Sequence, residues 1–381
     1  MFFLIPTLIV ICFILPVITA SRMIPVLLLS NDYNSFEIAN ILAVKLAGNF
    51  LGLLYFRRIF FEIGSFRLLT IAVVIIIHCF IFLFNFIDIK VYFFIFFIFG
   101  FFELCISSLI KPLIRNLKLS FVAQFEMLVD NIMRFLSGLL IIIKYQNLFL
   151  ILTGIISFSL IPYVLTEKNI KSLKADKNKI HLLDSKLSFV ILNYFPYFMS
   201  SLIFYTSSFL SSSYLIIFLT KIKINKAPTY LTIYLLGQLF FSYFFNKFVK
   251  SFPIHYSPLI VHGSILFFSS IIVIVLLFSH NIIFFHLNIP LAVTIFLYSS
   301  VFSTSFKSYF KNINTHSISE DMTDGQIKLI GGLFGIVIGT FSLTFNNRAS
   351  IFIIILSLNL AVFLYKIFEK FYRRLILQLK E

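Results

Sequence analysis

The sequence has little charge and no tryptophan. Only 12% of its 381 residues are charged, whereas 60% are hydrophobic and the mean hydropathy is +1.02. So little charge in so apolar a chain excludes a soluble globular domain and an intrinsically disordered protein. Without tryptophan, an aromatic belt at a membrane interface has to be built from the 17 tyrosines.

Cysteine and the common catalytic motifs are also scarce. Cys12, Cys79 and Cys105 lie inside apolar runs, and no Cys-x-x-Cys pair occurs. They indicate neither a disulfide framework nor a metal site. No Gly-x-x-x-x-Gly-Lys-Ser/Thr loop is present, so the chain has no built-in ATPase of that type. We therefore predict no catalytic residues, no cofactor and no metal site.

What the chain has in quantity is long apolar runs separated by short polar loops. Examples are Leu69–Phe86, Val91–Ile110 and Leu259–Phe278. At 1.5 Å per helical residue, runs of about 20 residues cross a hydrocarbon core of about 30 Å. Backbone groups in lipid must be satisfied within the segment, which favours helices, and the alternating pattern of a membrane barrel is not visible. The sequence predicts an all-α polytopic membrane protein with about twelve transmembrane helices.

The net charge is +16, and most of the lysines and arginines lie in loops on one face of the predicted membrane protein. The longest polar segment, Thr166–Lys186, carries six lysines, and Lys221, Lys223 and Lys226 are the main cluster on the opposite face. Lysine and arginine concentrate in cytoplasmic loops. We therefore expect a bacterial inner (plasma) membrane protein with both termini cytoplasmic, whose partner is the lipid bilayer and not nucleic acid.

The same polar segment divides the apolar runs evenly. We predict an N-terminal six-helix half at 1–166, a basic linker at 167–186, a C-terminal six-helix half at 187–368 and a cytoplasmic tail at 369–381. A weak internal echo supports this division, because Phe56-Arg57-Arg58-Ile59-Phe60 resembles Phe245-Asn246-Lys247-Phe248-Val249. Paired halves are how many transporters build a site near the middle of the membrane.

The 6+6 arrangement, the basic central loop and the loop after the second span resemble the major facilitator superfamily. That family carries a Gly-x-x-x-Asp-Arg-x-Gly-Arg-Arg-like motif in this loop. Here the matching piece is Gly64, with Arg67 three residues on, whereas Phe61 occupies the Asp position and Arg57 the first Gly position. Ser21-Arg22-x-x-Pro25 and Gly100-x-x-Glu103, with Pro112, are also similar. The resemblance implies transport by alternating access. It also implies that the loop after the second span takes part in gating, and the candidate residues there are Arg57, Arg58, Gly64 and Arg67.

Charged residues within the spans are the candidates for chemistry, since each costs at least about 2.5–3.5 kcal/mol to insert. The resemblance places the fourth span beside the central path, so Glu103 is a candidate for proton coupling, as is Asp130. A carboxylate in a low-dielectric path can take up and release a proton. The alternative is that Glu103 is a structural partner of Lys45 or Arg134.

The candidates for the substrate path are Arg22, Lys45, Arg134 and Gln238. Lys45 either contacts substrate, snorkels or pairs with an acid of a neighbouring helix, and Arg134 can instead pair with Asp130. Three cations against two deep acids leave a slightly positive wall, which fits an anionic or zwitterionic substrate. The hydroxyls of the second half are expected to bond to their own helix backbone, and His262 is expected to be a packing residue.

Three glycines in the eleventh span recur every four residues: Gly331, Gly335 and Gly339. Such a ridge of small residues lets another helix approach closely, so we predict a role in helix packing.

The leading functional hypothesis is a secondary active transporter that moves a small solute by alternating access, driven by protons. An anionic or amphipathic metabolite, a drug or a siderophore-like compound would fit. The alternatives are a lipid-linked saccharide flippase of another fold and a polytopic membrane transferase. The short loops and the scattered histidines disfavour the transferase.

Overall fold

The computed structural model describes the residues 33–63, 65–85, 88–115, 145–158, 195–211, 257–278, 319–344 and 349–378, together with isolated positions at 16, 17, 20, 28, 191, 244, 247, 248 and 251. Every regular element in these stretches is a helix. The predicted all-α membrane class is confirmed. Four of the apolar runs expected to span the membrane, at 4–29, 121–143, 228–246 and 282–305 of the sequence, lie outside the described stretches.

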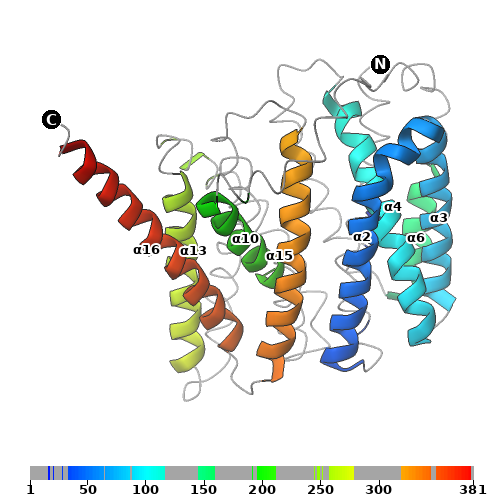
Figure 1. The fold of residues 1–381 in the computed structure, drawn as a ribbon. Helices are drawn as coiled ribbons and strands as arrows, with labels where there is room; N and C mark the ends of the chain where they lie inside the picture. Colours follow the sequence, from blue (N-terminus) through cyan, green and yellow to red (C-terminus); the bar gives the residue numbers. More distant parts are fainter. Residues whose placement is uncertain are drawn as a thin grey trace.

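The described helices form two groups that stand side by side (Figure 1). The N-terminal group consists of α2 (Ser35–Ile63), α3 (Ser65–Asn85), α4 (Ile89–Arg115) and α6 (Tyr145–Phe158). The C-terminal group consists of α10 (Phe195–Phe209), α13 (Ser257–Phe278), α15 (Ser319–Thr344) and α16 (Ser350–Gln378). Within the described parts, α2 and α15 form the main contact between the groups.

The outward surface of these helices is apolar. Within the described residues, five helices are long and apolar enough to cross a membrane, with spans at Phe36–Tyr55, Ile89–Ile106, Leu259–Leu277, Gly325–Ser342 and Ser350–Tyr372, and α3 adds the shorter apolar stretch Arg67–Leu83. Large apolar side chains such as Phe94, Val337 and Phe341 are more than 60% exposed. Exposed apolar surface on this scale has to face lipid, so the protein is an integral membrane protein.

Two helices of the N-terminal group begin at caps that lie at the same end of the bundle. Asn34 Oδ1 accepts from the backbone N–H of Glu37 at 2.9 Å, and Glu37 Oε2 accepts from the N–H of Asn34 at 2.8 Å. This reciprocal capping box starts α2. Asp88 precedes α4 and accepts from the N–H of Lys90 at 2.9 Å. Burial, followed by the charges of Glu37 and Asp88, raises the pKa of Tyr33, so both caps lie near this tyrosine.

The helices α2 and α4 pack in parallel along a glycine seam formed by Gly48, Gly52 and Gly100. A Cβ added to Gly52 would lie 2.8 Å from the carbonyl oxygen of Phe101. One added to Gly48 would collide with the carbonyl of Phe97, and one added to Gly100 with that of Lys45. Only glycine therefore allows the two backbones to lie in contact.

The predicted glycine ridge lies on α15, and two of its members face α10. A Cβ on Gly331 would lie 2.7 Å from Tyr205 Cβ, and one on Gly335 would lie 2.7 Å from Phe209 Cδ1. The third, Gly339, is buried, and its carbonyl accepts from Ser342 Oγ at 2.8 Å. Gly331 and Gly335 thus lie on the side of α15 that packs against α10, within the C-terminal group.

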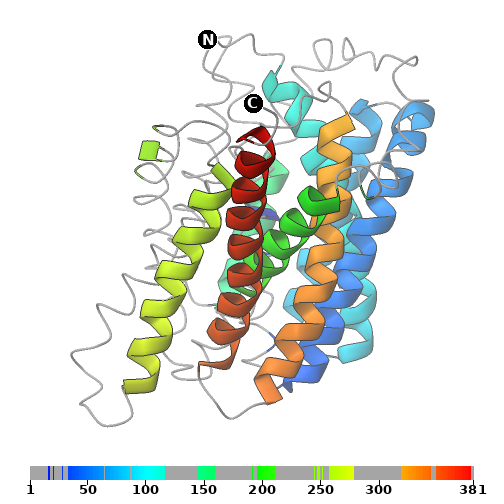
Figure 2. The same cartoon turned by 60° about the vertical axis from the view of Figure 1, so that its left-hand side comes forward.

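Different glycines of α15 face α2. A Cβ on Gly332 would lie 3.0 Å from Leu46 Cδ1, and one on Gly325 would lie 3.5 Å from Leu53 Cδ1. The residue numbers rise along one helix and fall along the other, so α2 and α15 are antiparallel. Figure 2 shows α15 in orange beside the blue helix α2, with the red helix α16 in front of the C-terminal group. Leucine side chains fill this contact between the groups.

Two helix boundaries differ from the predicted ones. α2 continues to Ile63, so Arg57 and Arg58 lie on its last turns and not in a loop, because the first strong helix breaker after the span is Gly64. α16 continues to Gln378, so most of the predicted tail prolongs the last helix.

Pro196 stands in the first turn of α10, where the backbone N–H that proline lacks would have had no hydrogen-bond partner within the helix.

Candidate functional site

An ion pair joins two helices inside the N-terminal group. Lys45 Nζ of α2 lies 2.8 Å from Glu103 Oε2 of α4, and the two side chains are 13% and 21% exposed. Both residues belong to stretches long enough to span the membrane. Because an isolated charge at this depth is costly, each residue neutralises the other. Of the two partners that the sequence suggested for Glu103, the structure therefore shows Lys45, and it shows that Lys45 pairs with an acid of a neighbouring helix.

The glycine seam explains why these two side chains meet. Gly48 follows Lys45 by one helical turn, and Gly100 precedes Glu103 by one turn, so each lies on the same side of its helix as the charge. With no side chain on either glycine, the backbones of α2 and α4 come together beside the charged pair. The short distance between ammonium and carboxylate is therefore built into the packing of the two helices.

An aromatic ring completes the surroundings of the ammonium group. Lys45 Nζ lies 5.4 Å from the centroid of the Phe99 ring, within the range of a cation–π interaction. Phe99 is fully buried and precedes Glu103 by one helical turn on α4. The ammonium therefore has a carboxylate and the face of a ring as neighbours, both supplied by α4.

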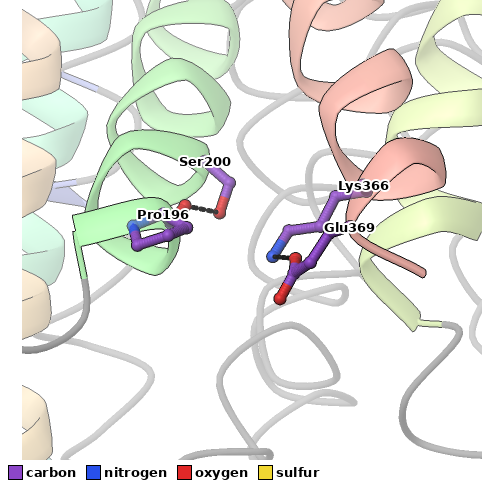
Figure 3. A network of polar contacts seen from close by, with 4 residues as sticks. All are labelled: Pro196, Ser200, Lys366 and Glu369. Atoms are coloured by element: carbon purple, nitrogen blue, oxygen red, sulfur yellow. Dashed lines mark hydrogen bonds and ion pairs between the residues drawn. The ribbon is translucent and has the colours of Figure 1, made fainter. Parts of the chain in front are cut away.

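A second lysine–glutamate pair on α16 has the same chemistry in another setting. Lys366 Nζ lies 3.2 Å from Glu369 Oε2, and the side chains are 20% and 25% exposed. Figure 3 shows both residues on one helix, beside the start of α10, where Ser200 bonds to the carbonyl of Pro196. Since the partners are three residues apart, this pair links no two helices.

A neutral polar network joins three helices of the C-terminal group. His262 Nδ1 of α13 donates to Asn359 Oδ1 of α16 at 2.8 Å. Asn359 Nδ2 donates to Ser207 Oγ of α10 and to the carbonyl of Ile355, each at 2.8 Å. All three side chains of the network are fully buried. In this group, a neutral network therefore links helices, as the Lys45–Glu103 ion pair does in the other group.

The comparisons with known proteins concern the fold. No model of a known protein family matches the sequence, and no curated protein is significantly similar to it. The solved structures do contain similar folds. The nucleoside transporter NupG matches with a TM-score of 0.67 and 10% identity, covering 95% of this chain and 96% of that one.

Two further solved structures agree. A structure concerned with substrate recognition in proton dependent oligopeptide transporters has a TM-score of 0.73 at 10% identity and covers 96% of each chain. A D-xylose-proton symporter has a TM-score of 0.67 at 11% identity, covering 95% of this chain and 96% of that one. The chain has the fold of the major facilitator superfamily.

This major facilitator fold confirms the fold expected from the resemblance. The similar structures are transporters and not enzymes. The alternative of a flippase with a different fold is incompatible with it.

Within the major facilitator fold, the structure brings together Lys45 and Glu103 among the predicted site residues. Arg67 lies exposed in the first turn of α3, and Arg57 and Arg58 lie on the end of α2. The remaining candidates are outside the described residues: Arg22, Gly64, Asp130, Arg134 and Gln238. In the described part of the chain, no group of three or more His, Cys, Asp or Glu is arranged to hold a metal ion.

The hydroxyls behave in three ways. Thr206 Oγ1 donates to the carbonyl of Leu202 at 2.9 Å and Ser211 Oγ to that of Ser208 at 3.0 Å, which confirms the expectation for these two. Ser207 differs, since it joins the network around Asn359. The Ser201 hydroxyl is buried and makes no hydrogen bond to the described residues.

Two features escaped the sequence reasoning. Asn359 is an amide in the middle of an apolar span, which is the same signal that selected Gln238. Gly48 and Gly52 have the four-residue spacing that selected the ridge on α15. In both cases the sequence contained the signal, and the structure shows which residues these side chains and glycines contact.

Proposed function

We propose that this protein is a secondary active transporter that moves a small solute across the membrane by alternating access. The observation that carries this proposal is the fold, which matches transporters for nucleosides, oligopeptides and xylose over nearly the whole of each chain. Binding between two helical halves near the middle of the bilayer is the common plan of such carriers. An anionic or amphipathic metabolite is the substrate class we favour.

The packing supports two units that move against each other. Between α2 and α4, and at Gly331 between α15 and α10, glycines of one helix contact the backbone or the Cβ of the next, whereas the glycines of α15 that face α2 meet the ends of leucine side chains. We propose that the units are 1–166 and 187–368, joined by the basic linker 167–186 and followed by the tail 369–381. Both termini are then cytoplasmic, in a bacterial inner membrane.

We propose Glu103 as a proton-coupling residue of this carrier. Its carboxylate belongs to a membrane-spanning stretch and contacts an ammonium group, so taking up a proton would change the charge of the pair. Asp130 is the second candidate for coupling. Arg22, Arg134 and Gln238 are proposed for the substrate path together with Lys45, and Arg57, Arg58, Gly64 and Arg67 for the cytoplasmic gate.

The experiment is solute-driven proton movement in proteoliposomes that contain the purified protein and an internal pH dye. Nucleosides, dipeptides, pentoses and organic acids are added one at a time to wild type and to Glu103→Gln. We expect at least one class to move protons in wild type and not in the variant. Equal proton movement in both would remove Glu103 from the coupling step and leave the transporter in place.

Alternating access is tested by fixing the contact between the groups. Leu46→Cys combined with Gly332→Cys places a thiol on each side of the α2–α15 contact for a reducible bifunctional crosslinker, and Gly263→Cys with Phe363→Cys does the same between α13 and α16. We expect the first crosslink to stop transport until it is reduced, and the second to leave transport intact. Transport at the wild-type rate through a crosslinked α2–α15 contact would contradict alternating access at this interface.

A further inference from the structure

The ion pair of the N-terminal group has a chemical consequence for the substrate. Lys45 lies in the middle of the span Phe36–Tyr55, with a carboxylate on one side and an aromatic ring within 5.4 Å. A carboxylate is therefore the group that this ammonium already binds. We propose that Lys45 is the binding group for a small organic carboxylate, and that Glu103 occupies its place when no substrate is bound. This inference rests on the proposed transport function.

The exchange between the two carboxylates is balanced by one proton. A proton from the aqueous side is transferred to the Glu103 carboxylate, which becomes a neutral carboxyl group and weakens its contact with Lys45. The carboxylate of the substrate then forms the ion pair with the ammonium group. One proton and one monoanion enter together, so the loaded site has the same net charge as the empty one. On release, both leave and the Lys45–Glu103 pair forms again.

Keeping the charge constant is favourable because the site is inside the membrane. An unpaired ammonium in a membrane-spanning stretch is costly, and so is an unpaired carboxylate. Protonation without an anion, or binding of an anion without a proton, would leave one of these charges uncompensated. The energetics therefore couple the two events to each other.

The geometry around the pair suits a small ligand. The glycine seam lets α2 and α4 approach closely beside the pair, and the buried ring of Phe99 lies 5.4 Å from the ammonium. The two side chains are 13% and 21% exposed, so the described residues do not enclose them fully. A ligand that takes the place of the Glu103 carboxylate has to be compact, because a bulky one would have to displace the helices.

Glu103 is the acidic side chain that pairs with Lys45. Other titratable side chains lie on α2, on α4 and on the helices packed against them: Tyr55 on α2, Lys90, Tyr92 and Cys105 on α4, His78 and Cys79 on α3, and Lys328 on α15, whose first turns also carry Glu320, Asp321 and Asp324. His78 and Lys328 are exposed, and the two cysteines are buried. On α2, Glu37 belongs to the helix cap.

The experiment measures binding to the full-length protein in lipid nanodiscs. The probes are acetate, lactate, benzoate and nicotinate, each compared with its neutral amide. In wild type, we expect at least one carboxylate to bind more tightly than its amide, and its affinity to rise as the pH is lowered, because binding takes up one proton. In Glu103→Gln, the same carboxylate should bind tightly at every pH. In Lys45→Met, the preference over the amide should disappear.

Matched variants separate binding from folding. Glu369→Gln makes the same chemical change in the Lys366–Glu369 pair, and we expect its binding and pH dependence to equal those of wild type. Lys45→Met combined with Glu103→Met removes both charges, so it should fold and show no preference for carboxylates. This double variant shows whether lost binding reflects the missing ammonium or a disrupted bundle.

The outcomes distinguish this inference from the proposed function. If no probe carboxylate binds wild type or Glu103→Gln more tightly than its amide, the inference is overturned, even where proteoliposomes carry neutral solutes. If carboxylates bind with the expected pH dependence but cause no flux, the anion site stands and the transport proposal fails. A pH dependence that persists in Glu103→Gln would also overturn the inference, because the linked proton would then bind elsewhere.

Discussion

The contacts inside the helix groups differ from the contact between them. Within the N-terminal group, a Cβ on Gly52 would lie 2.8 Å from a backbone carbonyl of α4. Between the groups, a Cβ on Gly325 would lie 3.5 Å from the end of a leucine side chain, which is an ordinary contact. A side-chain end can rotate away and a backbone cannot. The α2–α4 contact is therefore firm, and the α2–α15 contact is able to adjust.

The two groups also differ in how they satisfy buried polar atoms. The N-terminal group pairs two opposite charges, those of Lys45 and Glu103. The C-terminal group joins His262, Asn359 and Ser207 by hydrogen bonds between fully buried side chains. The first arrangement is suited to chemistry that changes charge, and the second to holding three helices in a fixed relation.

The largest effect is expected from Gly100→Leu. The new side chain would meet the backbone of Lys45, so α2 and α4 would have to separate, at a cost of about 3 kcal/mol in the free energy of unfolding. Gly154→Leu on α6 is the matched control, because nothing lies within 4 Å of its added Cβ. Thermal unfolding in detergent measures both. Equal stability of the two variants would show that the glycine seam is not a close contact.

An intermediate effect is expected from Asn359→Leu. The substitution removes the hydrogen bonds to His262 and Ser207 and leaves both buried, which we expect to lower the free energy of unfolding by about 1–2 kcal/mol. Ser357→Leu on the exposed side of the same helix is the control and should change stability little. Thermal unfolding of the two variants tests this. A loss as large in Ser357→Leu would assign the effect to α16 in general and not to the network.

The smallest effect is expected from Gly332→Ala. Its Cβ would meet Leu46 Cδ1 at 3.0 Å, and this methyl group can rotate away, so we expect a change in stability of at most about 0.5 kcal/mol. The neighbouring Gly331→Ala would meet Tyr205 Cβ at 2.7 Å and the backbone nitrogen of Thr206 at 3.1 Å, and should be clearly less stable. The same unfolding assay compares them. The reverse order would mean that the contact between the groups is the tighter one.

Much of the candidate site could be read from the sequence because charges within apolar runs are rare. Lys45 and Glu103 stood out for this reason. Their pairing could not be read, since it depends on the register of α2 against α4, which the glycine seam sets. Asn359 was missed because an uncharged amide is less conspicuous in such a run, and its importance comes from its two partners on other helices.

The sequence alone determined that the protein is helical and lies in a membrane. Long apolar runs leave no other way to satisfy the backbone in lipid, so this conclusion needs only local information. The tertiary structure decided that Lys45 meets Glu103. It also decided which glycines of α15 face α10 within the C-terminal group and which face α2 of the N-terminal group. Finally, it decided that the Ser207 hydroxyl accepts a hydrogen bond from Asn359 on another helix. These depend on the rotation and register of neighbouring helices, which arise from contacts between residues far apart in the chain.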